Sequence, residues 1–157
     1  GIAYVDVVCN KGYAFGMAAV LNTFANVPSY SWTVEAVAHE LGHNIGSPHT
    51  QSCSWPGGAL DNCYTPEGSC SSGPAPTNGG TVMSYCHLTS AGINFNNGFG
   101  TLPGDLIRGR VTNASCLTTA TTDTTAPTVS WCCSQCLNAR GTINSASAHS
   151  ENPAARA

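Results

Sequence analysis

The eleven residues HELGHNIGSPH, at positions 39 to 49, contain three histidines and one glutamate in a chain that is otherwise poor in charge. His39 and His43 are four positions apart. In a helix, residues at this spacing lie one turn apart on the same face, so both imidazoles can bind one metal ion. Zinc accepts imidazole nitrogen, and its catalytic sites use three protein ligands and leave one position for water.

His49, six residues after His43, is the candidate third ligand. A helix that continued through this segment would carry His49 away from the metal. Gly46 can adopt a positive φ angle at no steric cost, which ends the helix and turns the chain back. Pro48 disfavours any further helix. The segment therefore predicts a zinc site formed by His39, His43 and His49.

Glu40 directly follows the first ligand and is about 100° around the helix from it. It is too displaced to be an equal ligand, but it is near the open position. A carboxylate there can take a proton from zinc-bound water and pass it to a leaving amine. The alternative is a chance match or a set of buried structural histidines. Five fixed identities in eleven residues occur by luck on the order of once in 10⁴ chains of this length.

Several elements must position these residues. Residues 2–8, IAYVDVV, are β-rich and predict a strand, whereas residues 13–27 fit either a strand or a helix. From Thr33 the pattern becomes helical, with Ser31 or Thr33 as the cap. One apolar stripe at helical spacing runs along this helix and consists of Val34, Val37, Ala38, Leu41 and Ile45.

Residues 50–81 are rich in proline and glycine, and such a long irregular loop normally needs covalent staples or a functional reason. Cys53, Cys63 and Cys70 could supply the staples. A short turn around Met83 follows. Residues 103–112 predict a short helix with Leu106, Ile107 and Val111 directed inward.

The bulk composition excludes some functions. The chain has 157 residues, about one domain, with 8% charged residues and a formal net charge of −3. No basic patch exists to bind phosphates, so we expect no nucleic-acid partner. No apolar run approaches the roughly 20 residues of a membrane span. The nine cysteines favour disulfides in an oxidising compartment over a cytosolic zinc site, since only one CxxC, at 133–136, is present.

Both ends of the chain carry organisational signals. The sequence begins GIAYVDVVCN, without an initiator Met or a signal peptide, so we expect a piece of a longer precursor. TTATTDTTAPT, residues 118–128, has the composition of a linker. Residues 129–157 show no periodicity and could be the start of a damaged or following domain.

HELGHNIGSPH resembles the HExxHxxGxxH pattern of the metzincin zinc peptidases, and TVMSYC resembles their methionine turn. Within this group, the chain most resembles the reprolysin-like branch in its bacterial secreted form, over about residues 1 to 117. The segments that carry this resemblance are GIAYVDVVC, YSWTVEAVAHELGHN, GGTVMSYCH and NASCL. The resemblance implies the three histidines as zinc ligands, Glu40 as the base and Met83 as the floor of the site. Thr50 departs from the Asp of animal reprolysins.

The fold implied by this resemblance is α+β, the C-terminal part of a metzincin-like catalytic domain at residues 1–117. It would contain an edge strand, a zinc-binding helix, a loop-rich lower subdomain stapled by disulfides, the methionine turn and a short C-terminal helix. The N-terminal helix and strands of the family are not in the sequence. Tyr85 stands two residues after Met83, as in astacins and serralysins, and either assists the transition state or only packs.

Disulfide pairing follows partly from the resemblance, which implies Cys9 with Cys116. Three connectivities are open to Cys53, Cys63, Cys70 and Cys86. Local closure favours Cys63 with Cys70 and Cys53 with Cys86.

The function that this reading predicts is a secreted, monomeric zinc endopeptidase acting on protein or peptide substrates. The strand at residues 2–8 would hold the substrate by β-addition, and the loop at 88–102 would line the pocket for the residue after the scissile bond. Two alternatives stay open, namely a binding or adhesion module that retains zinc and a catalytically inert fragment.

Overall fold

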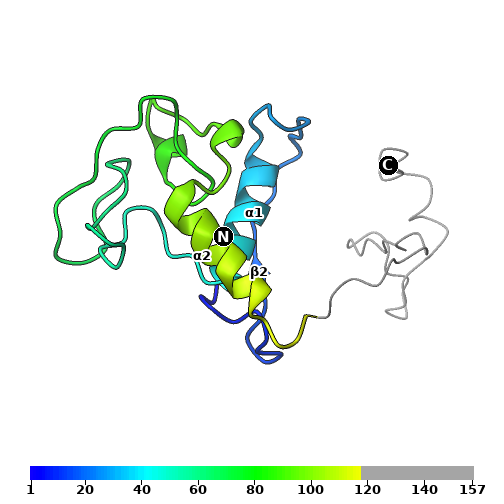
Figure 1. Ribbon diagram of the computed structural model, residues 1–157. Helices are drawn as coiled ribbons and strands as arrows, with labels where there is room; N and C mark the ends of the chain where they lie inside the picture. Colours follow the sequence, from blue (N-terminus) through cyan, green and yellow to red (C-terminus); the bar gives the residue numbers. More distant parts are fainter. Residues whose placement is uncertain (118–157) are drawn as a thin grey trace. The chain divides into compact units, whose positions relative to one another are not determined.

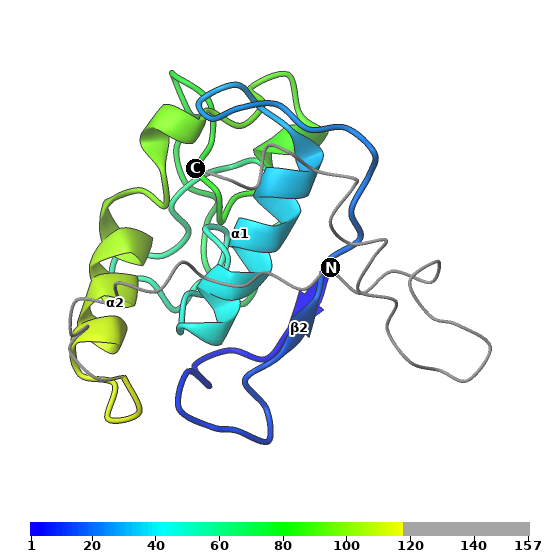
Figure 2. The same cartoon turned by 90° about the vertical axis from the view of Figure 1, so that its right-hand side faces the viewer.

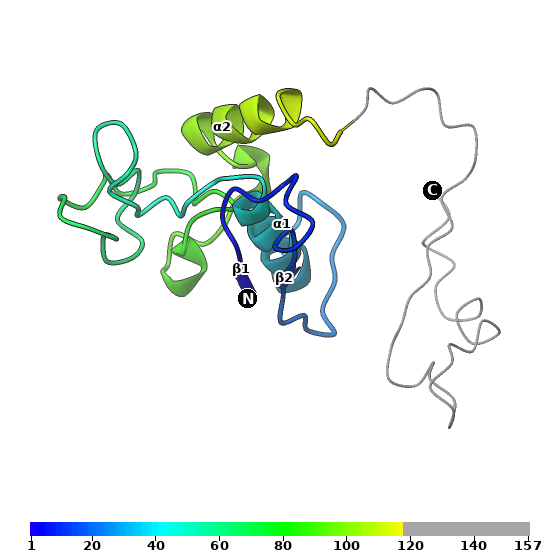
Figure 3. The same ribbon diagram turned by 90° about the horizontal axis from the view of Figure 1, so that it is seen from below.

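Helix α1 (Trp32–Asn44) runs through the middle of the computed structural model, which describes residues 1–117 (Figure 1). On one side of α1 lies a hairpin of β1 (Ile2–Ala3) and β2 (Gly16–Met17), which pair antiparallel. On the other side lies α2 (Thr101–Thr112), an arrangement visible in both Figure 2 and Figure 3.

Two short 3-10 helices, η1 (Cys86–Leu88) and η2 (Phe95–Asn97), precede α2. The architecture is α+β, with loops making up most of the described chain. These residues lie in one compact unit, Gly1–Thr118. The expected linker at 118–128 and tail at 129–157 lie outside the described residues. Within residues 1–117, no helix is long and apolar enough to cross a bilayer.

The strand expected over residues 2–8 is shorter than predicted, because its second half pairs with a helix end. The backbone N–H groups of Asp6 and Val7 donate to the carbonyls of His43 and Asn44, over 2.9 and 2.8 Å. The last carbonyls of a helix have no partner within the helix. This segment therefore caps α1 instead of extending the sheet, and Asp6 adopts a φ of 61° to do so.

The start of α1 is fixed by side chains that reach back to the preceding segment. Ser31 occupies the N-cap position, but its side chain makes no capping hydrogen bond. The Thr33 hydroxyl instead donates to the carbonyl of Leu21, and the Trp32 indole N–H donates to the carbonyl of Ala19, both over 2.7 Å. These bonds pin part of the ambiguous segment at 13–27 against the first turn of the helix.

The end of α1 confirms the predicted glycine bend. Gly46 has a φ of 118°. Its N–H donates to the carbonyl of His43 over 2.8 Å, and the N–H of Ser47 donates to that of Gly42 over 2.9 Å. This pair of bonds is the Schellman arrangement, in which a residue with positive φ terminates the helix and reverses the chain.

The buried face of α1 is the polar one, which the apolar periodicity did not predict. In the expected stripe, Val37 is 41% exposed and Leu41 is 54% exposed. The buried residues are Glu35, Ala36, His39, Glu40, Gly42 and His43. Gly42 explains part of why this face is buried, because the absence of a side chain there leaves room for Met83. A Cβ atom at Gly42 would lie 2.5 Å from the Met83 sulfur.

Helix α2 begins at Thr101, two residues before the predicted start, and buries a different set of residues. Pro103 and Gly104 are buried. Of the three residues expected to point inward, Leu106 and Ile107 are half-buried and Val111 is 41% exposed.

Cys9 and Cys116 form a disulfide, the pairing implied by the family resemblance. It ties the segment after β1 to the residues that follow α2. An ion pair between Asp6 and Arg110, at 2.7 Å, joins the segment after β1 to α2 itself. The N-terminal hairpin, the end of α1 and α2 are therefore held together.

The pairing expected for the other four cysteines is wrong. The structure joins Cys53 to Cys70 and Cys63 to Cys86, rather than Cys63 to Cys70 and Cys53 to Cys86. The reason is a backbone ladder in the long loop. The N–H of Glu67 donates to the carbonyl of Gln51 over 2.9 Å, and the N–H of Cys53 donates to that of Glu67 over 3.0 Å. This ladder brings Cys53 beside Cys70, which loop length alone could not indicate.

Candidate metal centre

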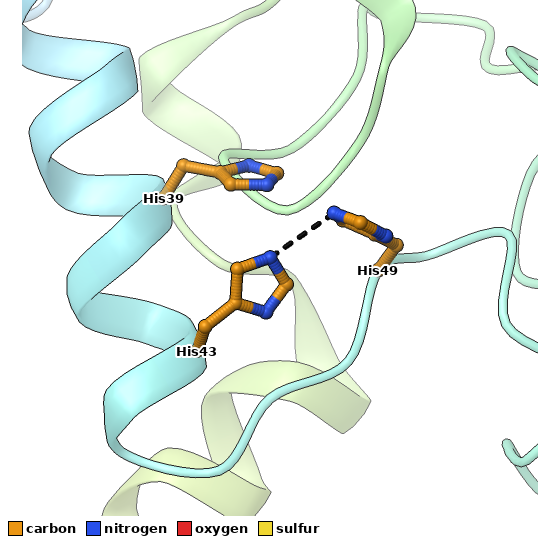
Figure 4. A group of neighbouring side chains, drawn as sticks. All are labelled: His39, His43 and His49. Atoms are coloured by element: carbon orange, nitrogen blue, oxygen red, sulfur yellow. Dashed lines mark hydrogen bonds between the residues drawn. The ribbon is translucent and has the colours of Figure 1, made fainter. Parts of the chain in front are cut away.

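Three imidazole rings converge beside α1 (Figure 4). His39 and His43 project from the helix, and His49 projects toward them from the segment after the bend. One ligand nitrogen from each ring lies within 4.8 Å of the other two. The Nε2 atoms of His43 and His49 are 3.0 Å apart. The structure thus brings together the three histidines that the sequence predicted as a group.

The second nitrogen of each helical histidine is already engaged. His39 Nδ1 donates to the carbonyl of Val82, and His43 Nδ1 donates to the carbonyl of Ser47, both over 2.7 Å. A carbonyl oxygen can only accept, so the proton of each neutral ring is on Nδ1. The lone pair is therefore on Nε2, the nitrogen that faces the centre of the group.

His49 has a different partner, the carboxylate of Glu67. Nδ1 of His49 lies 2.6 Å from Oε1 of Glu67. Glu67 lies in the irregular loop and was not among the predicted site residues. The one feature of the sequence that singles it out is that Glu67 is the only glutamate between Glu40 and Glu151. Nothing in the sequence placed it near His49, because the backbone ladder that folds the loop has no local pattern.

This donor set fits zinc. Three lone pairs directed at one point repel one another unless a cation lies between them. Ligand nitrogens at about 2.0–2.1 Å from a tetrahedral zinc would be about 3.3 Å from one another. The Nε2 atoms of His43 and His49, 3.0 Å apart, are close to this separation, and the His39 ligand nitrogen lies within 4.8 Å of both rings. Within the described residues, no fourth His, Cys, Asp or Glu joins the group, which leaves a coordination position for water or substrate.

Burial favours the neutral, ligand form of the helical histidines. It lowers the pKa of His39 to about 4, against a smaller opposite effect of the Val82 carbonyl. Burial likewise lowers the pKa of His43. Both rings are therefore uncharged at neutral pH, as metal binding requires.

Met83 is fully buried against α1, where it contacts Gly42 between the two helical histidines. Its carbonyl accepts the backbone N–H of Thr50 over 3.1 Å. The Met83 carbonyl thus binds Thr50, the residue after His49, and the carbonyl of the preceding residue, Val82, binds Nδ1 of His39. Thr50, which replaces the Asp of animal reprolysins, therefore lies beside the turn around Met83.

A cavity of about 260 Å³ opens over the three histidines. Glu40 lines it and is buried. Tyr85 also lines it, with ring centroids 4.7 Å from His49 and 5.9 Å from His39. The remaining lining residues are Gly1, Ile2, Ala3, Trp32, Glu35, Ala36 and His87. No residue of the loop at 88–102 lines this cavity, and the part of that loop in the pocket for the residue after the scissile bond stays a prediction.

In this α+β unit a helix and a glycine bend bring three imidazoles together, and this group fits the zinc site of the metzincins. Comparison with protein families agrees, since the model of metallo-peptidase family M12 matches residues 1–96. The chain therefore belongs to metallopeptidase family M12. Searches of curated proteins and of solved structures found no match.

Proposed function

We propose that this chain is a secreted zinc-dependent endopeptidase that cleaves protein or peptide substrates. The observation that carries this proposal is the convergence of three imidazoles whose Nδ1 atoms are all engaged, inside a cavity that also contains Glu40. Such an arrangement holds a metal ion firmly and leaves an acid–base group beside it.

His39, His43 and His49 bind the ion. When bound, zinc supplies a Lewis acid that polarises the scissile carbonyl and lowers the pKa of a coordinated water. The Glu40 carboxylate takes the proton of the attacking water and returns it to the leaving amine. Its position in the cavity, next in sequence to a ligand, supports this role.

Tyr85 acts as a hydrogen-bond donor to the oxygen of the scissile carbonyl. Burial raises the pKa of its hydroxyl, and the carboxylates of Glu67 and Glu40 raise it further. The hydroxyl therefore keeps its proton at neutral pH and can donate. Its ring packs against His49, which directs the side chain along the cavity.

The substrate backbone adds to β1. Ile2 and Ala3 pair with β2 and also line the cavity. A peptide that forms β-type hydrogen bonds with this strand would carry its scissile bond across the three histidines. The proposed secretion is supported by three disulfides in the described chain, which are typical of oxidising compartments.

Metal analysis together with a hydrolysis assay tests the proposal. The wild type should contain about one zinc per chain and cleave an unfolded protein substrate, and a chelator should abolish cleavage. His43→Ala should lose zinc and hydrolysis. His87→Ala is the matched control, because His87 lines the cavity without belonging to the triad and its loss should leave zinc bound. Equal zinc in wild type and His43→Ala would refute the site, and zinc without hydrolysis would favour a binding module.

A further inference from the structure

The cavity over the three histidines continues along α1 to a buried carboxylate. Glu35 lies one helical turn before His39 and lines the same cavity. Only 2% of the surface of Glu35 is exposed to solvent. A carboxylate so deeply buried costs free energy unless hydrogen bonds or an opposite charge compensate it. The partners of its two oxygens therefore decide what the cavity can accept.

One oxygen of Glu35 is fully engaged and the other is not. Oε2 accepts the hydroxyl of Tyr30 over 2.6 Å. Oε1 lies 3.0 Å from Nδ1 of His87, but neither of these atoms makes a well-aligned hydrogen bond within the described residues. Oε1 therefore keeps capacity to accept a donor that enters from the cavity.

No lysine or arginine side chain of the described residues lines the cavity beside this oxygen. The Lys and Arg residues in this part of the chain are Lys11, Arg108 and Arg110. Burial raises the pKa of the Glu35 carboxyl, more strongly than Tyr30 and His87 lower it. A cation seated beside Glu35 would stabilise its ionised form.

The wall around Glu35 is suited to a long side chain. Trp32 lies one turn nearer the start of α1, and its ring meets that of His87 edge to face at 5.3 Å. Apolar ring surface can cover the methylene stem of lysine or arginine while its charged end reaches a carboxylate. The distance to cover from the metal ligands is about one helical turn, roughly 5.4 Å, which a four-carbon stem spans.

We propose that Glu35 selects substrates with a cationic side chain, lysine or arginine, at a position flanking the scissile bond. The charged end donates to Oε1, and the stem lies along Trp32. This inference rests on the proposed peptidase function. Its rival is an internal ion pair between Glu35 and His87 that leaves the cavity for apolar side chains.

The test compares peptides that carry lysine or norleucine at each position flanking the scissile bond. Norleucine has a similar stem and no charge. The zinc-loaded wild type should prefer lysine at one position by about 10- to 100-fold in kcat/KM, as expected for a hydrogen bond to a charged group. Glu35→Gln should reduce this ratio to within about threefold, and Glu35→Asp should retain part of it. A wild type without the preference, or a Glu35→Gln variant that keeps it, would overturn the inference.

A binding measurement separates this inference from the proposed function. A matched pair of peptide hydroxamates that differ only in lysine or norleucine is titrated into the zinc-loaded full chain by calorimetry. Tighter binding of the lysine compound to the wild type, lost in Glu35→Gln, supports the inference even when no peptide is cleaved. Equal binding of both compounds to the wild type contradicts it. If Glu35→Gln does not fold, Glu35→Asp decides, since an unchanged ratio in that variant also contradicts it.

Discussion

Nδ1 of His49 lies 2.6 Å from Oε1 of Glu67, although 18 positions separate the two residues in the chain. A carboxylate on the second nitrogen of a ligand histidine fixes the tautomer and the orientation of the ring and raises its basicity. Glu67 is held in place by backbone hydrogen bonds to Gln51 and Cys53 and by the nearby disulfide of Cys53. The long irregular loop therefore positions the third candidate ligand.

Removal of the Glu67 carboxylate should weaken zinc binding. We expect Glu67→Ala to lose about 10- to 100-fold in zinc affinity, measured by competition with a chromogenic chelator. Glu67→Gln keeps an oxygen that accepts the His49 proton and should lose less. Asp105→Asn, at an exposed carboxylate paired with Arg108, is the control and should bind zinc as the wild type does. Unchanged affinity in Glu67→Ala would show that His49 needs no such support.

Two glycine-to-alanine substitutions in helices should have opposite effects on stability. At Gly42 a Cβ atom would lie 2.5 Å from the sulfur of buried Met83 and 2.9 Å from Cε1 of Phe99. Gly42→Ala should cost about 1–3 kcal/mol of unfolding free energy through overpacking. At Gly109 in α2 a Cβ atom meets nothing within 4 Å, and Gly109→Ala should add about 0.5–1 kcal/mol through helix propensity. Denaturant unfolding measures both, and a stabilising Gly42→Ala would contradict the contact with Met83.

The zinc-ligand group was predictable because its determinants are local. Two histidines one helical turn apart and a glycine at the bend determine most of the geometry, and the backbone around Gly46 agrees with that reasoning. The disulfide that joins Cys9 and Cys116 came from family resemblance rather than from any local rule.

The parts that sequence reasoning missed depend on contacts between distant segments. The apolar periodicity of α1 identified an apolar face, but it could not show whether other residues cover that face. Val37 and Leu41, which belong to it, are in fact exposed. His87, which faces Glu35, lies in a 3-10 helix, and Glu67, which faces His49, lies in a folded loop. Neither element has a periodic signal in the sequence. For the same reason loop length misassigned two disulfides.

The burial of Glu35 should give a pH-dependent stability difference. Because burial raises the pKa of this carboxyl above its unfolded value, the folded state binds the proton more tightly. The resulting stabilisation is complete below the unfolded pKa and is lost as the pH rises through the folded pKa. Glu35→Gln does not titrate, so its melting temperature relative to wild type should be higher at about pH 7 than at about pH 4.

Thermal unfolding with chelator present throughout measures this difference and excludes effects of metal loss. The exposed Asp105→Asn variant serves as the control and should show a much smaller change between the two pH values. A difference between Glu35→Gln and wild type that stays constant with pH would mean that the Glu35 carboxyl is not perturbed by burial.

Peptide mapping without reduction should recover the disulfides of the long loop. We expect one linked fragment that contains Cys53 and Cys70 and another that contains Cys63 and Cys86. The backbone ladder between Gln51, Glu67 and Cys53 places Cys53 beside Cys70, as the first of these links needs. A fragment that joins Cys63 to Cys70 would contradict the folded path of the loop and the placement of Glu67 beside His49.

The most direct test of the proposed chemistry is hydrolysis by Glu40→Gln with its zinc content measured in the same preparation. Gln preserves the shape of the side chain and cannot act as a base, while the three imidazoles are untouched. We predict that the variant keeps about one zinc per chain and that its rate of peptide hydrolysis falls by at least about 10²- to 10⁴-fold, the usual contribution of a general base. A variant that retains both its zinc and the wild-type rate would show that Glu40 is not the base.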